Sequence, residues 1–250
     1  MSEPTKPRFD GRPYDALRPV EVIVGFQRTS EGSVLYRAGG TVVLCTASID
    51  AKVPPFLEGK GRGWLTAEYQ MHPSSSAGRR EARDGRGKAP SGRTLEIQRL
   101  VGRALRAAIE LNRVGERTIT IDCDVLEADG GTRTASVTGG CVALVLALAK
   151  VGVRAIRETV AATSVGHLDA EGLALDLCYV EDSAARVDLN VVATSSGKIV
   201  EVQGTAEGAP VARRDLDSMV DLALSGIDRL SALQREAIAS AGVDLAKVLV

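Results

Sequence analysis

Hydrophobic and polar residues follow two different spacings along this chain, and the spacing predicts where strands and helices lie. Residues 118–125 alternate, with isoleucine, cysteine or valine at odd positions and threonine or aspartate at even ones. This alternation predicts a strand with one buried and one polar face. Residues 32–50 contain two β-rich runs separated by Ala38-Gly39-Gly40, which predicts a hairpin. Four later runs also predict strands: 158–167, 173–180, 186–193 and 198–204.

Helical spacing predicts three helices. The first begins near Thr94, and Arg99, Arg103 and Arg106 fall on its open face. Its apolar positions are Leu95, Leu100, Ala104, Leu105, Ala108 and Ile109. The second, residues 136–151, has no charge before Lys150 and is expected to be buried nearly all round. The third lies within residues 211–250, with a buried stripe of Leu216, Met219, Val220, Ala223, Ile227, Leu230 and Leu233.

Residues 53–92 show no sustained period and are crowded with Gly, Pro, Ser and Arg, which predicts a long loop. Each half of the chain thus has strands first and helices afterwards. This order predicts an α+β fold in which helices pack on antiparallel or mixed sheets. We expect a single domain over residues 1–250, with possible internal halves at about 10–155 and 156–245.

Composition indicates an ordinary globular protein, with 44% hydrophobic residues and a net charge of −1. The polar, proline-containing N-terminus lacks the apolar core of a signal peptide, and no stretch reaches the roughly 18 apolar residues of a membrane helix. We therefore expect a cytoplasmic protein with no membrane partner. The cysteines form no CxxC pair and are expected to be buried free thiols: Cys45, Cys123, Cys141 and Cys178.

Positive charge is concentrated in one part of the chain. Residues 79–106 contain nine basic and three acidic side chains, a net +6, which leaves −7 for the remainder. Such segregation allows a nearly neutral protein to hold a phosphate backbone on one face. The alternative is a solvated helix face followed by a charged loop.

Residues 127–140, EADGGTRTASVTGG, place two glycines and an arginine between a predicted strand and a predicted helix. Glycines let the backbone approach a ligand, backbone N–H groups form an anion nest, and the helix adds its positive end. Arg133 adds a planar fork of donors that fits phosphate. Neither a Walker motif nor GxGxxG is present, so a nucleotide triphosphate or dinucleotide is not favoured. The alternative is a plain turn with a surface arginine.

Acidic side chains gather in residues 176–190. We place Asp182 at the end of one predicted strand, with Asp188 and Asn190 on one face of the next and Asp176 just upstream. Carboxylates on neighbouring strands can share a hydrated Mg²⁺. A solvated polar strand face is the alternative. His72 and His167 have no recognisable Ser or Cys partner.

Several long stretches across nearly the whole chain resemble the ribonuclease PH family, bacterial phosphate-dependent exoribonucleases that trim the 3′ ends of transfer RNA precursors. These stretches are FDGRPYDALRPV, EGSVLYRAGGTVVLCTAS, VPPFLEGKGRGWLTAEYQM, SGRTLEIQRLVGRALRAA, IDCDVLEADGGTRTASVTGG, YVEDSAARVDLNVV and VEVQGTAEG.

The resemblance implies roles for individual residues. The expected inorganic phosphate site is Arg93, Gly131, Thr132 and Arg133. The expected catalytic and Mg²⁺-binding aspartates are Asp182 and Asp188, and Asp188 is our choice for delivering a proton to the departing 3′ oxygen. Arg80 and Arg83 match family positions that grip RNA; Ser74 replaces a third such arginine in a loop one residue longer, and Arg79 and Arg86 can compensate.

The resemblance also implies a duplicated βαβ-type fold, like that of the second domain of ribosomal protein S5, and a ring-shaped homo-hexamer built as a trimer of dimers. Phosphate is then the co-substrate, Mg²⁺ the cofactor and a transfer RNA precursor the substrate, shortened by one nucleotide with release of a nucleoside diphosphate. The alternative is a non-catalytic RNA-binding ring subunit of an exosome-like assembly. Such subunits typically lack the phosphate arginines or the aspartates, whereas this chain has both sets.

Overall fold

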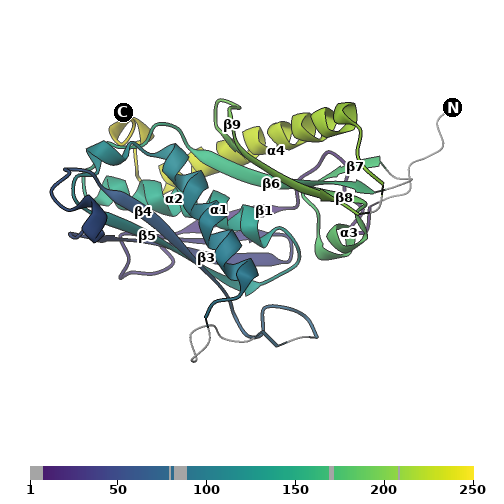
Figure 1. Cartoon of the computed structure of the whole chain (residues 1–250), viewed down its shortest axis with the longest axis horizontal. Coiled ribbons are helices and arrows are strands. Elements are labelled where there is room, and N and C mark those ends of the chain that lie inside the picture. The colour runs from purple at the N-terminus through teal and green to yellow at the C-terminus, as the bar shows by residue number, and fades with distance from the viewer. Residues whose placement is uncertain (1–7, 79, 82–88, 169–171, 208) are drawn as a thin grey trace.

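The structure is a computed structural model, and it describes residues 8–78, 80–81, 89–168, 172–207 and 209–250. Two β-sheets and three long helices form the described part of the chain (Figure 1). Three short 3₁₀ turns accompany them: Pro55–Leu57, Leu111–Arg113 and Leu245–Lys247.

The first sheet has five strands in the order β1-β2-β3-β5-β4. The strands are β1 (Val20–Val24), β2 (Gly32–Ala38), β3 (Thr41–Asp50), β4 (Trp64–Met71) and β5 (Thr118–Glu127). The predicted hairpin and the alternating strand are confirmed as β2–β3 and β5. The prediction of one long loop over residues 53–92 is wrong, because β4 lies inside it and pairs with β5 in parallel. The sheet is therefore mixed.

The second sheet is antiparallel throughout, in the order β7-β6-β8-β9. Its strands are β6 (Val160–Leu168), β7 (Gly172–Leu175), β8 (Val187–Thr194) and β9 (Ile199–Ala206). The prediction of a strand over 173–180 fails beyond Leu175. Asp176 takes a positive φ of 56°, which breaks the extended chain, and a short helix, α3 (Tyr179–Ala184), follows.

The long helices lie where they were predicted. They are α1 (Gly92–Ala108), α2 (Thr132–Lys150) and α4 (Arg213–Ser240). Leu95 is the exception in the apolar stripe of α1, because it is 44% exposed. Helix α2 is long and apolar enough to cross a membrane by length and composition, yet 89% of that window is buried inside the protein. It is a core helix.

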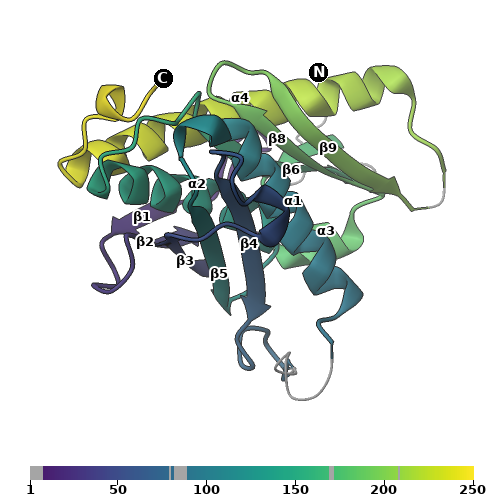
Figure 2. The ribbon, with the colours of Figure 1, turned by 60° about the vertical axis from the view of Figure 1, so that its left-hand side comes forward.

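Alternation along β6 and β8 gives the second sheet two apolar faces. Ala161, Val165 and Val191 pack against α4, whereas Val160 and Val192 belong to the core around α1 and α2. Helix α2 contacts both sheets, and Figure 2 shows α1 between β4 and β9. Even-numbered residues of β8 therefore face α1 and α2, which matters for the site described below.

One core cluster combines residues of both halves, including Val43 and Leu144 from the first and Val160, Val192 and Ile238 from the second. The core is therefore shared between the two halves, and the assignment of one domain with two internal halves stays a prediction. All four cysteines are free and buried, as expected from the sequence.

Candidate active site

Two helix N-termini carry the arginines expected to bind phosphate. Ser91 caps α1 by accepting a hydrogen bond from Thr94 N at 3.1 Å, which places Arg93 in the first turn. Gly131 precedes α2, so Arg133 lies in the first turn of that helix. Neither helix has an acidic residue in its first turn. A cation there adds to the positive end of the helix dipole, which is unfavourable without an anion. The N-termini of α1 and α2 are therefore both suited to bind an anion.

The turn before α2 requires glycine at both positions. Gly130 and Gly131 have φ values of 76° and 67°, in the left-handed region. A Cβ at Gly130 would lie 2.7 Å from Leu177 O, and one at Gly131 would lie 2.8 Å from Arg18 Nη2. The close approach of residues 177–178 at Gly130 and of Arg18 at Gly131, together with the two positive φ values, therefore explains the double glycine.

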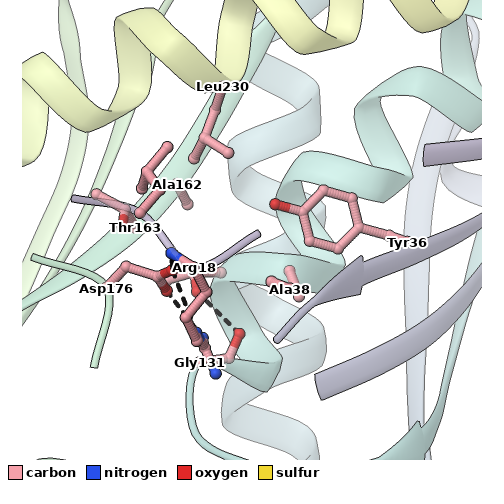
Figure 3. Close-up of a pocket in the computed structure, with 11 residues that line it drawn as sticks. Arg18, Tyr36, Ala38, Gly131, Ala162, Thr163, Asp176 and Leu230 are labelled. Atoms are coloured by element: carbon pink, nitrogen blue, oxygen red, sulfur yellow. Dashed lines mark hydrogen bonds and ion pairs between the residues drawn. The ribbon is translucent and has the colours of Figure 1, made fainter. Parts of the chain in front are cut away.

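Arg18 supports the same turn from behind (Figure 3). Its Nη1 donates to Asp129 O at 2.7 Å, while its Nη2 forms an ion pair with Asp176 Oδ1 at 2.8 Å. Thr41 Oγ1 donates to Gly130 O at 2.6 Å. The carbonyl groups of the turn thus have partners on this side, which holds the turn in one conformation for a ligand on the other.

Asp176 is not available to share a cation with the other aspartates, contrary to our prediction. Burial alone would raise its pKa, but the charge and hydrogen bonds of Arg18 hold the pKa of this carboxyl below its usual value. Arg12 adds a second cation, with Nη1 3.7 Å from Asp176 Oδ2. Asp176 is therefore a structural anchor, and sequence reasoning missed its partner.

Asp182 lies on α3 and not at the end of a strand, which corrects the predicted placement. The preceding residue, Glu181, is buried and accepts from Arg8 Nε at 2.8 Å and from Cys178 N at 3.1 Å. Tyr179 N donates to Asp129 Oδ1 at 3.2 Å. These contacts fix the short helix against the glycine turn, and Asp182 is held half-buried beside them.

Asp188 and Asn190 project from one face of β8, as predicted. Asn190 Nδ2 donates to both carboxylate oxygens of Asp188, at 3.3 and 3.2 Å. Burial and the neighbouring Asp182 raise the pKa of Asp188 to about 6, and Arg133 and Arg93 oppose this rise. Burial also raises the pKa of Asp182 against the same two arginines. The structure thus brings the two aspartates and the two arginines within electrostatic range of one another.

Arg133 and Thr132 have additional partners that the sequence did not indicate. Arg133 Nη1 donates to Gln203 Oε1 at 2.7 Å and lies 3.3 Å from Glu96 Oε1. The hydroxyls of Thr132 and Tyr69 are 2.9 Å apart. Strands β4 and β9 therefore each contribute a side chain that contacts the first turn of α2.

Asp182 and Asp188 are the residues that fit a divalent cation. Mg²⁺ commonly takes one or two protein carboxylates and completes its shell with water and phosphate oxygens. The raised pKa of Asp188 in the presence of Asp182 shows two carboxylates that repel each other, which a cation would relieve. Among the described residues no group of three or more His, Cys, Asp or Glu side chains is arranged around a metal position.

The basic segment is divided between structural contacts and open surface. Arg103 pairs with Glu201 at 2.6 Å, and Arg106 donates to Leu65 O at 2.9 Å while lying over the ring of Trp64. These two arginines join α1 to β9 and β4. Arg80 and Ser74 are exposed. The remaining predicted RNA contacts, Arg79, Arg83 and Arg86, lie outside the described residues.

Comparison with protein families matches the model of domain 1 of the 3′ exoribonuclease family to residues 16–150 and that of domain 2 to residues 158–226. The chain belongs to the 3′ exoribonuclease family. The ribonuclease PH of Listeria innocua is 49% identical over 237 residues, covering 92% of this chain and 95% of the relative. That of Bacillus pumilus is 51% identical over 234 residues, covering 91% and 96%. The enzyme is a phosphorolytic 3′–5′ exoribonuclease that uses inorganic phosphate as co-substrate.

Two solved structures share the fold at low sequence identity. Rice Rrp46 has a TM-score of 0.75 at 18% identity and covers 91% of this chain and 98% of its own. An archaeal exosome core chain has a TM-score of 0.72 at 19% identity and covers 92% and 91%. The predicted α+β fold of the ribonuclease PH type is thereby confirmed.

Proposed function

We propose that Arg93, Gly131, Thr132 and Arg133 hold the attacking phosphate, and that Asp182 and Asp188 act at the 3′ end of the RNA. The observation that carries this proposal is the meeting of two arginine-bearing helix N-termini with two carboxylates of raised pKa. Perturbed carboxyl groups beside fixed cations are typical of reactive sites.

The reaction joins one oxygen of inorganic phosphate to the phosphorus of the last phosphodiester and breaks the bond from that phosphorus to the 3′ oxygen. The nucleoside diphosphate leaves, and the departing 3′ oxygen takes a proton. Inorganic phosphate and the phosphodiester are both anions, and they have to approach each other for this reaction to occur. Arg93, Arg133 and the positive ends of α1 and α2 offset their repulsion and hold the phosphate in line.

Asp182 and Asp188 would bind Mg²⁺, which supplies charge neutralisation at the scissile phosphate when bound. We assign to Asp188 the second task of giving a proton to the departing oxygen. A bound Mg²⁺ would oppose the raised pKa that this task needs, so metal binding is the primary role of the pair. Burial and Asp182 both favour the acid form of Asp188 by raising its pKa. Asn190 fixes the orientation of this carboxyl through its two hydrogen bonds.

The substrate we propose is the 3′ end of a transfer RNA precursor, gripped by Arg80 together with Arg79, Arg83 and Arg86. A ring-shaped homo-hexamer would gather these basic segments where RNA enters and would reconcile RNA binding with a net charge of −1. The fold shared with an archaeal exosome core chain supports an assembly of several subunits. We propose a cytoplasmic enzyme that forms one domain over its 250 residues.

The test is a 3′-labelled transfer RNA precursor incubated with the enzyme and Mg²⁺, with and without inorganic phosphate. Nucleoside diphosphates that appear only with phosphate would support the proposal. Release of monophosphates regardless of phosphate would mean hydrolysis on the same fold. Binding of RNA without any release would favour the alternative, a non-catalytic ring subunit.

Arg133→Ala tests the phosphate site itself. We expect the KM for phosphate to rise about tenfold or more while the KM for RNA changes little, because the variant removes a cationic fork. Arg213→Ala is the matched control, since Arg213 lies on α4 with its side chain 91% exposed. An unchanged phosphate dependence of Arg133→Ala would move the site elsewhere.

A further inference from the structure

We propose that Gln203 is a positioning residue for phosphorolysis, which orients the guanidinium of Arg133 without neutralising it. This inference rests on the proposed role of Arg133 in binding phosphate. Gln203 lies on β9, which comes from the second half of the chain, whereas Arg133 comes from the first.

Strand register places Gln203 beside the reactive groups. Gln203 pairs directly with Asn190 across the β8–β9 ladder, and directly opposed residues of an antiparallel pair share one face. That face, which carries Asp188 and Asn190, is directed towards α1 and α2. Glu201, two residues earlier on the same face, contacts Arg103 on α1. Gln203 is thus part of the wall that carries the proposed catalytic aspartates.

Three side chains from three elements form a closed set of contacts. Arg133 Nη1 donates to Gln203 Oε1 at 2.7 Å, and Gln203 Nε2 donates to Glu96 Oε1 at 2.9 Å. The same Glu96 oxygen lies 3.3 Å from Arg133 Nη1. The carboxylate and the guanidinium together allow one orientation of the amide, because its oxygen has to face the cation and its nitrogen the anion.

These contacts involve only one nitrogen of the guanidinium. Within the described residues, neither Nε nor Nη2 of Arg133 donates a hydrogen bond to the protein. The pair Nε and Nη2 is therefore available as a fork for two phosphate oxygens. Because Gln203 holds Nη1, the plane of the fork is set before phosphate arrives, and less ordering is needed on binding.

A neutral acceptor suits this position better than an acidic one. Arg133 is 19% exposed, so a carboxylate at the position of Gln203 would form a strong, partly desolvated ion pair and compete with phosphate. The amide accepts the same hydrogen bond and leaves the positive charge for the ligand. The existing carboxylate, Glu96, is 46% exposed and is separated from Arg133 by a longer contact, so water screens it.

The experiment compares Gln203→Glu and Gln203→Met in phosphorolysis of a labelled RNA, with phosphate and RNA titrated separately. We expect Gln203→Glu to raise the KM for phosphate at least tenfold, and Gln203→Met to raise it about threefold to tenfold, with the KM for RNA within twofold of wild type. Glu201→Gln is the matched control, because it lies on the same strand and face but contacts Arg103; its phosphate KM is expected to stay unchanged.

A double-mutant cycle with Arg133→Ala separates the inference from the proposed function. If Gln203 acts through Arg133, the neutral variant Gln203→Met adds no further rise in phosphate KM in the Arg133→Ala background. Should Arg133→Ala raise this KM while both Gln203 variants leave it within twofold of wild type, the inference is overturned. An Arg133→Ala variant with normal phosphate KM would instead contradict the proposed phosphate site.

A readout that does not depend on turnover completes the test. Inorganic phosphate is expected to raise the melting temperature of the wild type and of Glu201→Gln, because it binds the folded state. The rise is expected to be much smaller for Gln203→Glu. A phosphate-induced rise equal to that of wild type would overturn the inference, as would an equal increase in the KM values for RNA and phosphate.

Discussion

The pKa values of a buried aspartate, Asp176, and of a half-buried one, Asp188, are shifted in opposite directions on the two sides of the Gly130–Gly131 turn. Behind the turn, Arg18 holds the pKa of Asp176 below its usual value. On the reactive side, burial and Asp182 raise the pKa of Asp188 to about 6, although Arg133 and Arg93 are near. Asp176 has cations in direct contact, whereas Asp188 accepts its hydrogen bonds, among the described residues, from the neutral amide of Asn190.

Under the proposed function, one small region would serve both the stability of the protein and its reaction. Charges that are paired in direct contact fix the shape of the turn, since a buried charge with its partner has one favourable arrangement. Carboxylates without a direct cation partner are destabilising in the free enzyme, and they are the groups that a cation or a proton can change. Stability and activity are therefore expected to respond differently to substitutions on the two sides.

Asp176→Asn is expected to have the largest effect on stability, because it removes the carboxylate that pairs with Arg18 behind the turn. Asparagine tolerates the positive φ at this position, so the substitution removes the charge with little backbone strain. Arg18 would be left buried without its carboxylate, and we expect the free energy of unfolding to fall by about 3–5 kcal/mol. Urea denaturation measures this, and a loss below about 1 kcal/mol would contradict the anchoring role.

Asp188→Asn acts on the reactive side and changes turnover. We expect kcat to fall at least a hundredfold, about 2.7 kcal/mol in activation free energy, because both metal binding and proton delivery depend on this carboxyl. RNA binding measured by filter retention is expected to stay within twofold of wild type. A variant that keeps more than about a tenth of the wild-type kcat would refute the assignment.

The same variant is expected to be more stable than wild type at neutral pH in the presence of EDTA. The folded protein binds more protons than the unfolded chain between the ordinary aspartate pKa of 3.8 and about 6, so the stability of the wild type falls as pH rises through this window. Asparagine carries no such penalty. Allowing for partial exposure, we expect a gain of about 1–2 kcal/mol at pH 7 and none below pH 3. Equal stability at both pH values would contradict the raised pKa.

The smallest effect is expected at an exposed ion pair remote from both sides. Lys198 lies 2.9 Å from Glu158, and hydrogen bonds from Ser196 and Lys198 lower the pKa of Glu158 to about 2. The side chain of Lys198 is nevertheless 74% exposed. Water and salt screen such a pair, so Lys198→Ala is expected to change the free energy of unfolding by less than about 1 kcal/mol. A larger loss would mean that an ion pair can stabilise this protein even when its lysine is exposed to solvent.

Sequence reasoning was strongest where the pattern is local. The alternation in residues 118–125 predicts β5, and the uncharged run after Arg133 predicts the buried helix α2. Strand β4 also alternates, with Leu65, Ala67 and Tyr69 buried, but its eight residues follow a glycine-rich segment that conceals the pattern. The positive φ of Asp176 was equally hidden, because an aspartate in a β-rich run gives no sign of it.

The site itself was predictable only in part. The arginines, glycines and aspartates follow from motifs, and the structure brings Arg93, Arg133, Asp182 and Asp188 into electrostatic range. Their specific roles stay predictions. The supporting pairs were not predictable, since Arg18 and Asp176 are 158 residues apart in the chain and Arg133 and Gln203 are 70 apart. No local pattern couples residues at such separations.

The division of the site between the two halves has a consequence for synthesis. Arg93 and Arg133 leave the ribosome before Asp188 and Gln203, and β9 has to pair with β8 before the wall facing α1 is complete. At roughly 5–20 residues per second, the stretch of about 110 residues from Arg93 to Gln203 takes on the order of 5–20 s to emerge. A growing chain therefore cannot use the proposed site on nearby RNA before Gln203 has left the ribosome, because the residues proposed to act there are not yet all present.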